Sequence, residues 1–85
     1  MYAKTELVKK VQRALDDVYF GNGESVTVGE VVFDRFGFTF RESKRATPHY
    51  WVDVHESDGM VWIEFYGTLG TKPIVVGIPK DTIHI

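Results

Sequence analysis

The period of the hydrophobic pattern changes once along the chain, near Gly21, and this change restricts the fold more than any other feature. Before it, apolar residues recur three or four positions apart, which is typical of one face of an amphipathic helix. These residues are Leu7, Val8, Val11, Leu15, Val18 and Tyr19. After it, short runs of alternating apolar and polar residues are separated by glycine, proline or Asp-Gly, as in a β-sheet. The pattern predicts one N-terminal helix followed by strands.

The helix is predicted to run from about Glu6 to Phe20. Thr5 has the side-chain oxygen that an N-cap requires, and Gly21 suits a left-handed C-cap because it has no Cβ. The charged residues on the outer side of the helix are interpreted as a solvated surface.

The rest of the chain predicts five or six short strands. Strands are expected at Ser25–Phe33, Phe38–Arg41, Tyr50–Glu56, Met60–Tyr66, Ile74–Ile78 and Thr82–Ile85, with loops at Glu42–Pro48 and Gly67–Pro73. Gly29, inside the first segment, suggests a bulge or bend. Short strands in this number do not stay flat with one face exposed. We expect an α+β fold in a single domain, residues 1–85, in which the helix (about 6–20) packs on a strongly curved antiparallel sheet of five to six strands (about 24–85) or a small barrel.

The composition excludes several classes of protein. With 85 residues, 44% of them hydrophobic, the chain can build one small core. The absence of cysteine excludes disulfides, thiolate zinc sites and a cysteine nucleophile, and it favours a cytoplasmic location. The first residues contain no apolar stretch suited to a signal peptide or membrane span, so we expect no association with a membrane. A net charge of −2 disfavours non-specific binding to nucleic acid.

Asp58 and Gly59 give the strongest hairpin signal in the sequence. A two-residue turn there pairs Trp51 with Tyr66, Asp53 with Glu64, His55 with Trp62 and Ser57 with Met60 on one face, and Val52 with Phe65 and Val54 with Ile63 on the other. The aliphatic and phenylalanine face is predicted to be core. The opposite face then carries two carboxylates directly opposite one another, among aromatic rings.

The opposed carboxylates of Asp53 and Glu64 would repel each other by an amount on the order of 0.2–1 kcal/mol. A shared proton, a nearby Arg41 or Arg45, a bound cation or a basic residue of a partner would each relieve this repulsion. Alternatively, both carboxylates are simply solvated at the sheet surface, where water and salt screen them.

The aromatic residues of the same face, Trp51, Trp62 and Tyr66, allow two interpretations. Exposed together, they would form a patch typical of a binding interface, because tryptophan and tyrosine dominate interface hot spots. Covered by a neighbouring strand or loop, they would form a second small core. The sequence alone leaves both interpretations open.

Asp53, His55 and Glu64 are the residues best suited to chemistry. Two carboxylates assisted by a histidine could transfer protons, and the same side chains could ligate a metal ion. No serine lies in the glycine-flanked elbow of hydrolases, and 85 residues offer little depth for a closed pocket. We therefore expect no enzymatic activity and no cofactor, and we assign no metal ligand. A small carboxylate- or metal-dependent enzyme remains an alternative.

A second candidate surface is basic. Arg41, Lys44 and Arg45 are followed within a few residues by the aromatic run His49-Tyr50-Trp51. Positive charge beside stacking rings is the combination that single-stranded nucleic-acid binders use. We interpret the basic residues as a solvated loop and keep nucleic-acid binding as an alternative.

Two segments also resemble a known family. Gly29–Phe40, with the sequence GEVVFDRFGFTF, resembles the first signature of Sm-like RNA-binding proteins, in which a glycine precedes a strand and a Phe-Asp-x-Phe turn leads into the next. Ile78–Ile85 is similar to their second signature. The resemblance implies a helix followed by a small RNA-binding barrel.

The sequence as a whole favours a small stand-alone, non-catalytic recognition module, a regulator or inhibitor that binds a protein partner. The predicted partner-binding residues are Trp51, Asp53, His55, Trp62, Glu64 and Tyr66. The alternatives are Sm-like RNA binding through Arg41, Lys44 and Arg45, and a small carboxylate- or metal-dependent enzyme. Self-association into a homo-oligomer is left open.

Overall fold

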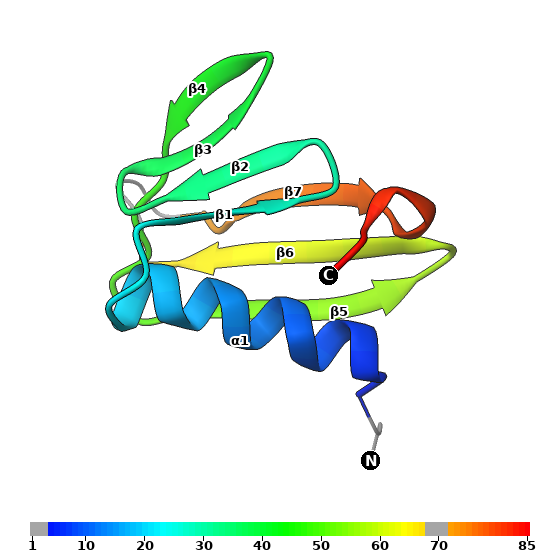
Figure 1. Ribbon diagram of the computed structural model, residues 1–85. Coiled ribbons are helices and arrows are strands. Elements are labelled where there is room, and N and C mark those ends of the chain that lie inside the picture. The colour runs from blue at the N-terminus through cyan, green and yellow to red at the C-terminus, as the bar shows by residue number, and fades with distance from the viewer. Residues whose placement is uncertain (1–3, 68–71) are drawn as a thin grey trace.

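The computed structural model describes residues 4–67 and 72–85. Figure 1 shows one helix beside two antiparallel sheets. The elements are α1 (Glu6–Phe20), β1 (Ser25–Val28), β2 (Val31–Asp34), β3 (Gly37–Phe40), β4 (Glu42–Arg45), β5 (Trp51–Ser57), β6 (Met60–Tyr66), β7 (Ile74–Pro79) and the 3-10 helix η1 (Lys80–Thr82). One sheet has the order β1-β2-β3-β4 and the other β5-β6-β7. The fold is therefore α+β, and most of the predicted loop Gly67–Pro73 lies outside the described residues.

The helix prediction is confirmed for α1. The Thr5 hydroxyl accepts a hydrogen bond of 3.2 Å from the backbone N–H of Val8, as an N-cap does. The left-handed C-cap predicted at Gly21 is wrong, because its φ is −122°. The N–H groups of Gly21 and Gly23 instead both donate to the carbonyl of Asp17, at 3.1 and 2.9 Å, and close the end of the helix.

The single curved sheet or small barrel is wrong, because the described residues form two separate sheets that do not close. The predicted strand Ser25–Phe33 divides at Gly29, whose φ of 62° turns the chain so that Val28 pairs with Val31. The predicted loop Glu42–Pro48 contains β4, which returns along β3 after a tight turn at Arg41, where φ is 68°. Both turns extend the first sheet as a four-stranded meander of short hairpins.

The terminal strand predicted at Thr82–Ile85 is also wrong. The chain forms η1, in which the Thr82 hydroxyl donates to the carbonyl of Pro79 at 2.7 Å and the N–H of Ile83 donates to the carbonyl of Lys80 at 3.2 Å. These local hydrogen bonds use groups that a strand would offer to a neighbour. Ile83 nevertheless packs into the core, where it is 8% exposed.

The helix and both sheets contribute to one hydrophobic core. Its largest buried side chains are Phe33, Phe65, Leu15, Ile63 and Ile78. The ring of Phe65 lies at the centre, with ring centroids 5.2 Å from Tyr19 and 6.1 Å from Phe33. Figure 1 shows α1 running along β5, and the Gln12 side chain links the two by donating to the carbonyl of Val52 at 2.7 Å.

The only helix of more than one turn in the described part of the chain, α1, is not long and apolar enough to cross a membrane.

Candidate functional site

The predicted register of the β5–β6 hairpin is confirmed at every pair, from Trp51 opposite Tyr66 to Ser57 opposite Met60. Asp58 and Gly59 form the turn with φ values of 54° and 75°, as a type I′ turn requires. The inner residues of the two strands are buried: Val52, Val54, Val61, Ile63 and Phe65. The alternating positions therefore point away from the core. We call the side chains of Trp51, Asp53, His55, Trp62, Glu64 and Tyr66 the outer face.

Strand β7 adds two residues to this surface that sequence reasoning missed. Val75 pairs with Glu64, and Gly77 pairs with Trp62. A Cβ atom placed on Gly77 would lie 2.6 Å from Cζ3 of Trp62, so the indole ring rests directly against the glycine. A glycine inside a strand is the signal that could have revealed this close approach.

The aromatic residues of the outer face are not a second core. Trp51 is 57% exposed, and its ring lies 5.4 Å from that of Tyr66 at an angle of 56°. Trp62 and Tyr66 are half-buried, and the indole N–H of Trp62 donates to the carbonyl of Ser57 at 3.3 Å. The tilted pair of Trp51 and Tyr66 leaves an aromatic surface open to solvent at one end of the hairpin.

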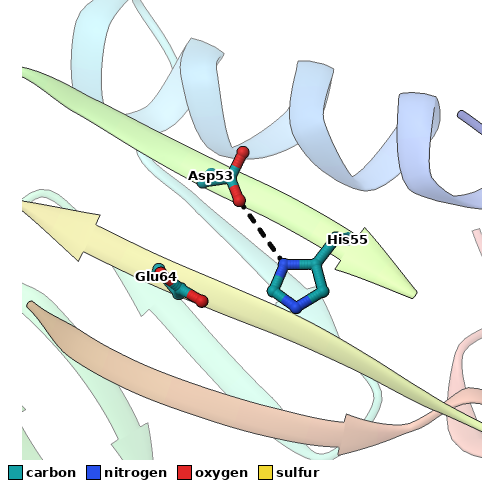
Figure 2. Close-up of side chains that lie close together, drawn as sticks. All are labelled: Asp53, His55 and Glu64. Carbon is teal, nitrogen blue, oxygen red and sulfur yellow. Dashed lines mark ion pairs between the residues drawn. The ribbon is translucent and has the colours of Figure 1, made fainter. Parts of the chain in front are cut away.

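Asp53, His55 and Glu64 lie together beside these rings (Figure 2). Asp53 and Glu64 are opposed across β5 and β6, and Nδ1 of His55 lies 3.4 Å from Oδ2 of Asp53. One nitrogen or oxygen atom from each of the three side chains lies within 4.8 Å of the others. The side chains of His55 and Asp53 are 45% and 35% exposed, so the cluster is accessible to a ligand.

The Tyr66 hydroxyl orients the carboxylate of Glu64 by donating a hydrogen bond to its Oε2. This hydrogen bond is the main reason that the pKa of Tyr66 is raised, with smaller contributions from desolvation and from the negative charges of Glu64 and Asp53. The phenol therefore remains a donor to the carboxylate at neutral pH. Its ring belongs to the aromatic pair and its hydroxyl to the acidic cluster, so Tyr66 connects the two parts of the outer face.

Neither carboxylate of the outer face forms an ion pair with lysine or arginine in residues 4–67 and 72–85. The ion pairs there are Lys9 with Glu6, His55 with Asp53 and Lys80 with Glu56. Arg41 and Arg45, which the sequence suggested as neutralising residues, lie at the β3–β4 hairpin of the other sheet. Intramolecular neutralisation by these arginines is therefore wrong.

The predicted basic surface is divided by the geometry of β4. Lys44 and Arg45 are consecutive strand residues, so their side chains point to opposite faces of the sheet. The guanidinium of Arg41 lies over the ring of Phe40, 5.3 Å from its centroid. Lys44 and Arg41 line a groove of about 550 Å³ between the β3–β4 hairpin and β7. Arg45 lines a second hollow with His49, and a third hollow is lined by both Lys44 and Arg45. None of these three hollows is lined by all three basic residues.

The groove between β3–β4 and β7 was not predicted either. Its apolar lining includes Phe38, Phe40, Val76 and Ile78. The groove was not predicted because Glu42–Pro48 was interpreted as a loop. Without β4 there is no hairpin to form the second wall of the groove beside β7. His84 is exposed near the end of the chain and does not belong to a cluster of metal-ligating side chains in the described residues.

The fold and the outer face thus define a small α+β protein with an aromatic and acidic sheet surface. Comparison with known proteins adds no identity, because no protein-family model, no curated protein and no solved structure matches the chain.

Proposed function

We propose that the protein is a non-catalytic recognition module whose outer face binds a segment of a protein partner that carries lysine or arginine. The observation that carries the proposal is the opposed pair Asp53 and Glu64, which has no lysine or arginine partner in the described residues and shares its face with the exposed ring of Trp51. A cationic side chain from a partner would satisfy both features.

The carboxylates supply the charge complementarity. Directly opposed like charges destabilise a sheet, so the free protein retains a repulsion that a partner's cation would remove. Such complementarity selects the partner and speeds its approach, because long-range attraction steers oppositely charged surfaces together. A basic segment gains from both carboxylates at once, since Asp53 and Glu64 lie on adjacent strands.

The aromatic rings supply the anchor. Trp51 and Tyr66 form a tilted pair in which Trp51 is 57% exposed, and lysine or arginine stacks on exposed aromatic rings through cation–π attraction. Each such contact contributes about 0.5–2 kcal/mol, depending on how far the cation is desolvated. Trp62, which is fixed against Gly77, extends the apolar surface along the hairpin.

The hairpin contributes to the core through its inner face, without the side chains of the outer face. Val52, Val54, Ile63 and Phe65 are all buried on the inner side. Variants of the outer face can therefore test binding in a protein that remains folded.

The test is a selection from random short peptides displayed on phage, followed by affinity measurements on the selected peptides. We expect the selected peptides to be enriched in lysine and arginine. Trp51→Ala and Glu64→Gln should each weaken their binding by a factor of about ten, which corresponds to about 1.4 kcal/mol. Phe36→Ala is the matched control, because Phe36 is 64% exposed but lies in the turn between β2 and β3.

The proposal fails if the selected peptides show no enrichment in basic residues, or if they bind the Trp51→Ala variant as tightly as the unmodified protein. Peptides that lose affinity on Phe36→Ala instead would place the binding surface on the first sheet. Rising salt should weaken binding of the basic peptides, because salt screens their attraction to Asp53 and Glu64.

A further inference from the structure

We infer that Asp53, His55 and Glu64 form a binding site for a divalent transition-metal ion of the zinc class. The inference does not depend on the proposed binding of a basic segment, although both would use the same two carboxylates. It rests on the positions of the donor atoms, on their chemical type and on the charge of the cluster.

The donor atoms already lie close to the spacing that a zinc ion needs. Ligand atoms about 2.0–2.1 Å from a tetrahedral zinc ion are separated from each other by roughly 3.3 Å. Nδ1 of His55 and Oδ2 of Asp53 are 3.4 Å apart, and no separation within the set of three exceeds 4.8 Å. Figure 2 shows the carboxylate of Glu64 on the neighbouring strand, beside the side chains of Asp53 and His55.

The backbone holds this arrangement in place before any ion binds. Asp53 and Glu64 are register partners, and His55 is the next residue of β5 on the same face. Tyr66 fixes one carboxylate oxygen of Glu64 by donating to Oε2, as residues behind a metal ligand commonly do. Three ligands on paired strands therefore need little reorganisation, in contrast to ligands on a loop.

The chemistry of the donors selects the class of metal. Magnesium and calcium prefer sites made entirely of oxygen, whereas an imidazole nitrogen favours zinc, copper, nickel or cobalt. Three protein ligands leave a fourth position of a tetrahedral ion open to water or to a ligand from outside. The exposure of His55 and Asp53, 45% and 35% of their side chains, gives the ion access from solvent.

The charge of the cluster favours a cation. The carboxylates of Asp53 and Glu64 have no lysine or arginine partner in the part of the chain that the structure describes. A divalent ion would neutralise both and remove their mutual repulsion. The ion and a basic segment are then competitors for one pair of carboxylates, so the metal would reduce the affinity of the outer face for basic peptides.

The experiment is isothermal titration of the untagged protein with zinc chloride after dialysis against EDTA. We expect saturable binding of a single ion per chain, with a matching rise in melting temperature. His55→Ala and Glu64→Gln should each weaken binding about tenfold or more, since even the loss of a residue behind a metal ligand has an effect of that size. His84→Ala is the control for an exposed histidine outside the cluster and should bind as the unmodified protein does.

A second measurement keeps the inference testable if a variant is poorly folded. Imidazole nitrogen resonances of the unmodified protein should show a zinc-dependent shift for His55 and none for His49 or His84. Absence of saturable binding, or binding that survives in His55→Ala with its usual affinity, would overturn the inference. Magnesium chloride at the same concentration should not compete, and competition by magnesium would also contradict the assignment.

The two proposals fail in different ways. If zinc does not bind, selection of basic peptides in the presence of EDTA still tests the recognition function. If basic peptides do not bind but zinc does, the carboxylate pair is a metal site and the aromatic rings have another role.

Discussion

The two faces of the β5–β6 hairpin share one backbone and one register, yet their side chains differ in burial and in charge. The inner face is apolar and buried except for Glu56, which lies opposite Val61 and forms an ion pair with Lys80, and it packs against α1 and the first sheet. The outer face places Asp53 opposite Glu64 and leaves Trp51 57% exposed. Folding therefore explains the composition of the inner face and leaves that of the outer face unexplained.

In such a small protein, selection for function is expected to act on the outer face, because formation of the core does not explain its residues. A chain of 85 residues has a small margin of stability. Repulsion between two carboxylates and an exposed tryptophan therefore contribute nothing to a stability that is already small. Residues that reduce stability without supporting the core are characteristic of binding and catalytic sites. Variants that alter one face at a time show how much each face contributes to the free energy of unfolding.

The largest effect is expected on the inner face, for Phe65→Ala. Phe65 is fully buried and contacts the aromatic rings of Tyr19, Phe33 and Phe38, so truncation should lower the free energy of unfolding by about 3–5 kcal/mol. Trp51→Ala, on the outer face of the same hairpin, should lower it by less than about 1 kcal/mol. Urea unfolding followed by circular dichroism measures both.

Phe65→Leu provides a milder variant of the same site if Phe65→Ala does not fold at all. Equal losses for Trp51→Ala and Phe65→Leu would mean that the outer face is structural, and the contrast between the two faces would disappear.

Local sequence signals predicted the helix and the register of the hairpin, and left open whether the aromatic residues of the outer face are exposed. The spacing of Val8, Val11 and Leu15 and the cap at Thr5 predicted α1, and the Asp58-Gly59 turn fixed the hairpin register. Both depend on neighbours along the chain, which a pattern can reveal. The candidate cluster followed from the register, because opposed strand positions are determined once the turn is known.

The parts that failed depend on turns or on contacts between distant segments. Gly29 signalled a bend but not a complete reversal, and Arg41 gave no signal because a non-glycine residue rarely adopts its φ of 68°. Strand β4 is polar at every position and exposed throughout, so the usual alternation was absent. Without these two reversals, the first sheet could not be separated from the second.

The next largest effect is expected where the outer face is packed most tightly, for Gly77→Ala. The added Cβ would lie 2.6 Å from the ring of Trp62 and force the indole to move. We expect a loss of roughly 1–2 kcal/mol, near the lower end for overpacking, because the ring has solvent on one side to move into. Tryptophan fluorescence should shift at the same time.

Val75→Ala is the matched control, since Val75 occupies the preceding outward position of β7 and is 52% exposed. Its effect should stay within about 0.5 kcal/mol. An unchanged fluorescence spectrum in Gly77→Ala would contradict the close contact between ring and glycine.

A smaller effect, with a pH dependence, is expected for two tyrosines: Tyr19 of α1, which packs against the core, and Tyr66 of the outer face. Burial, together with the nearby charge of Asp34, raises the pKa of Tyr19, whose hydroxyl donates to the carbonyl of Gly37 at 2.8 Å. Because the tyrosine of the unfolded chain has the ordinary pKa of about 10, the unfolded chain loses the phenol proton first as pH rises. The contribution of Tyr19 is therefore present below about pH 10 and is lost progressively at higher pH.

Tyr19→Phe should lower the free energy of unfolding by about 0.5–1.5 kcal/mol at neutral pH, through loss of the hydrogen bond. It should also make the alkaline loss of stability shallower. Tyr66→Phe should change the alkaline slope less, because Tyr66 is on the outer face and its raised pKa arises mainly from the hydrogen bond to Glu64. Urea unfolding across the alkaline range compares the three proteins. Identical slopes for all three would contradict this assignment.

The smallest effect has the opposite sign and concerns Asp53→Asn. Removing one of two opposed charges should raise the free energy of unfolding by about 0.2–1 kcal/mol in dilute buffer with a chelator, and high salt should abolish the gain because exposed charges are screened. Glu24→Gln, an exposed acid in the loop before β1, should have no comparable effect. A loss of stability in Asp53→Asn would mean that Asp53 already stabilises the free protein, through its contact with His55 or through a proton shared with Glu64. The carboxylates would then be structural groups, and neither a basic segment nor a metal ion would be needed to explain them.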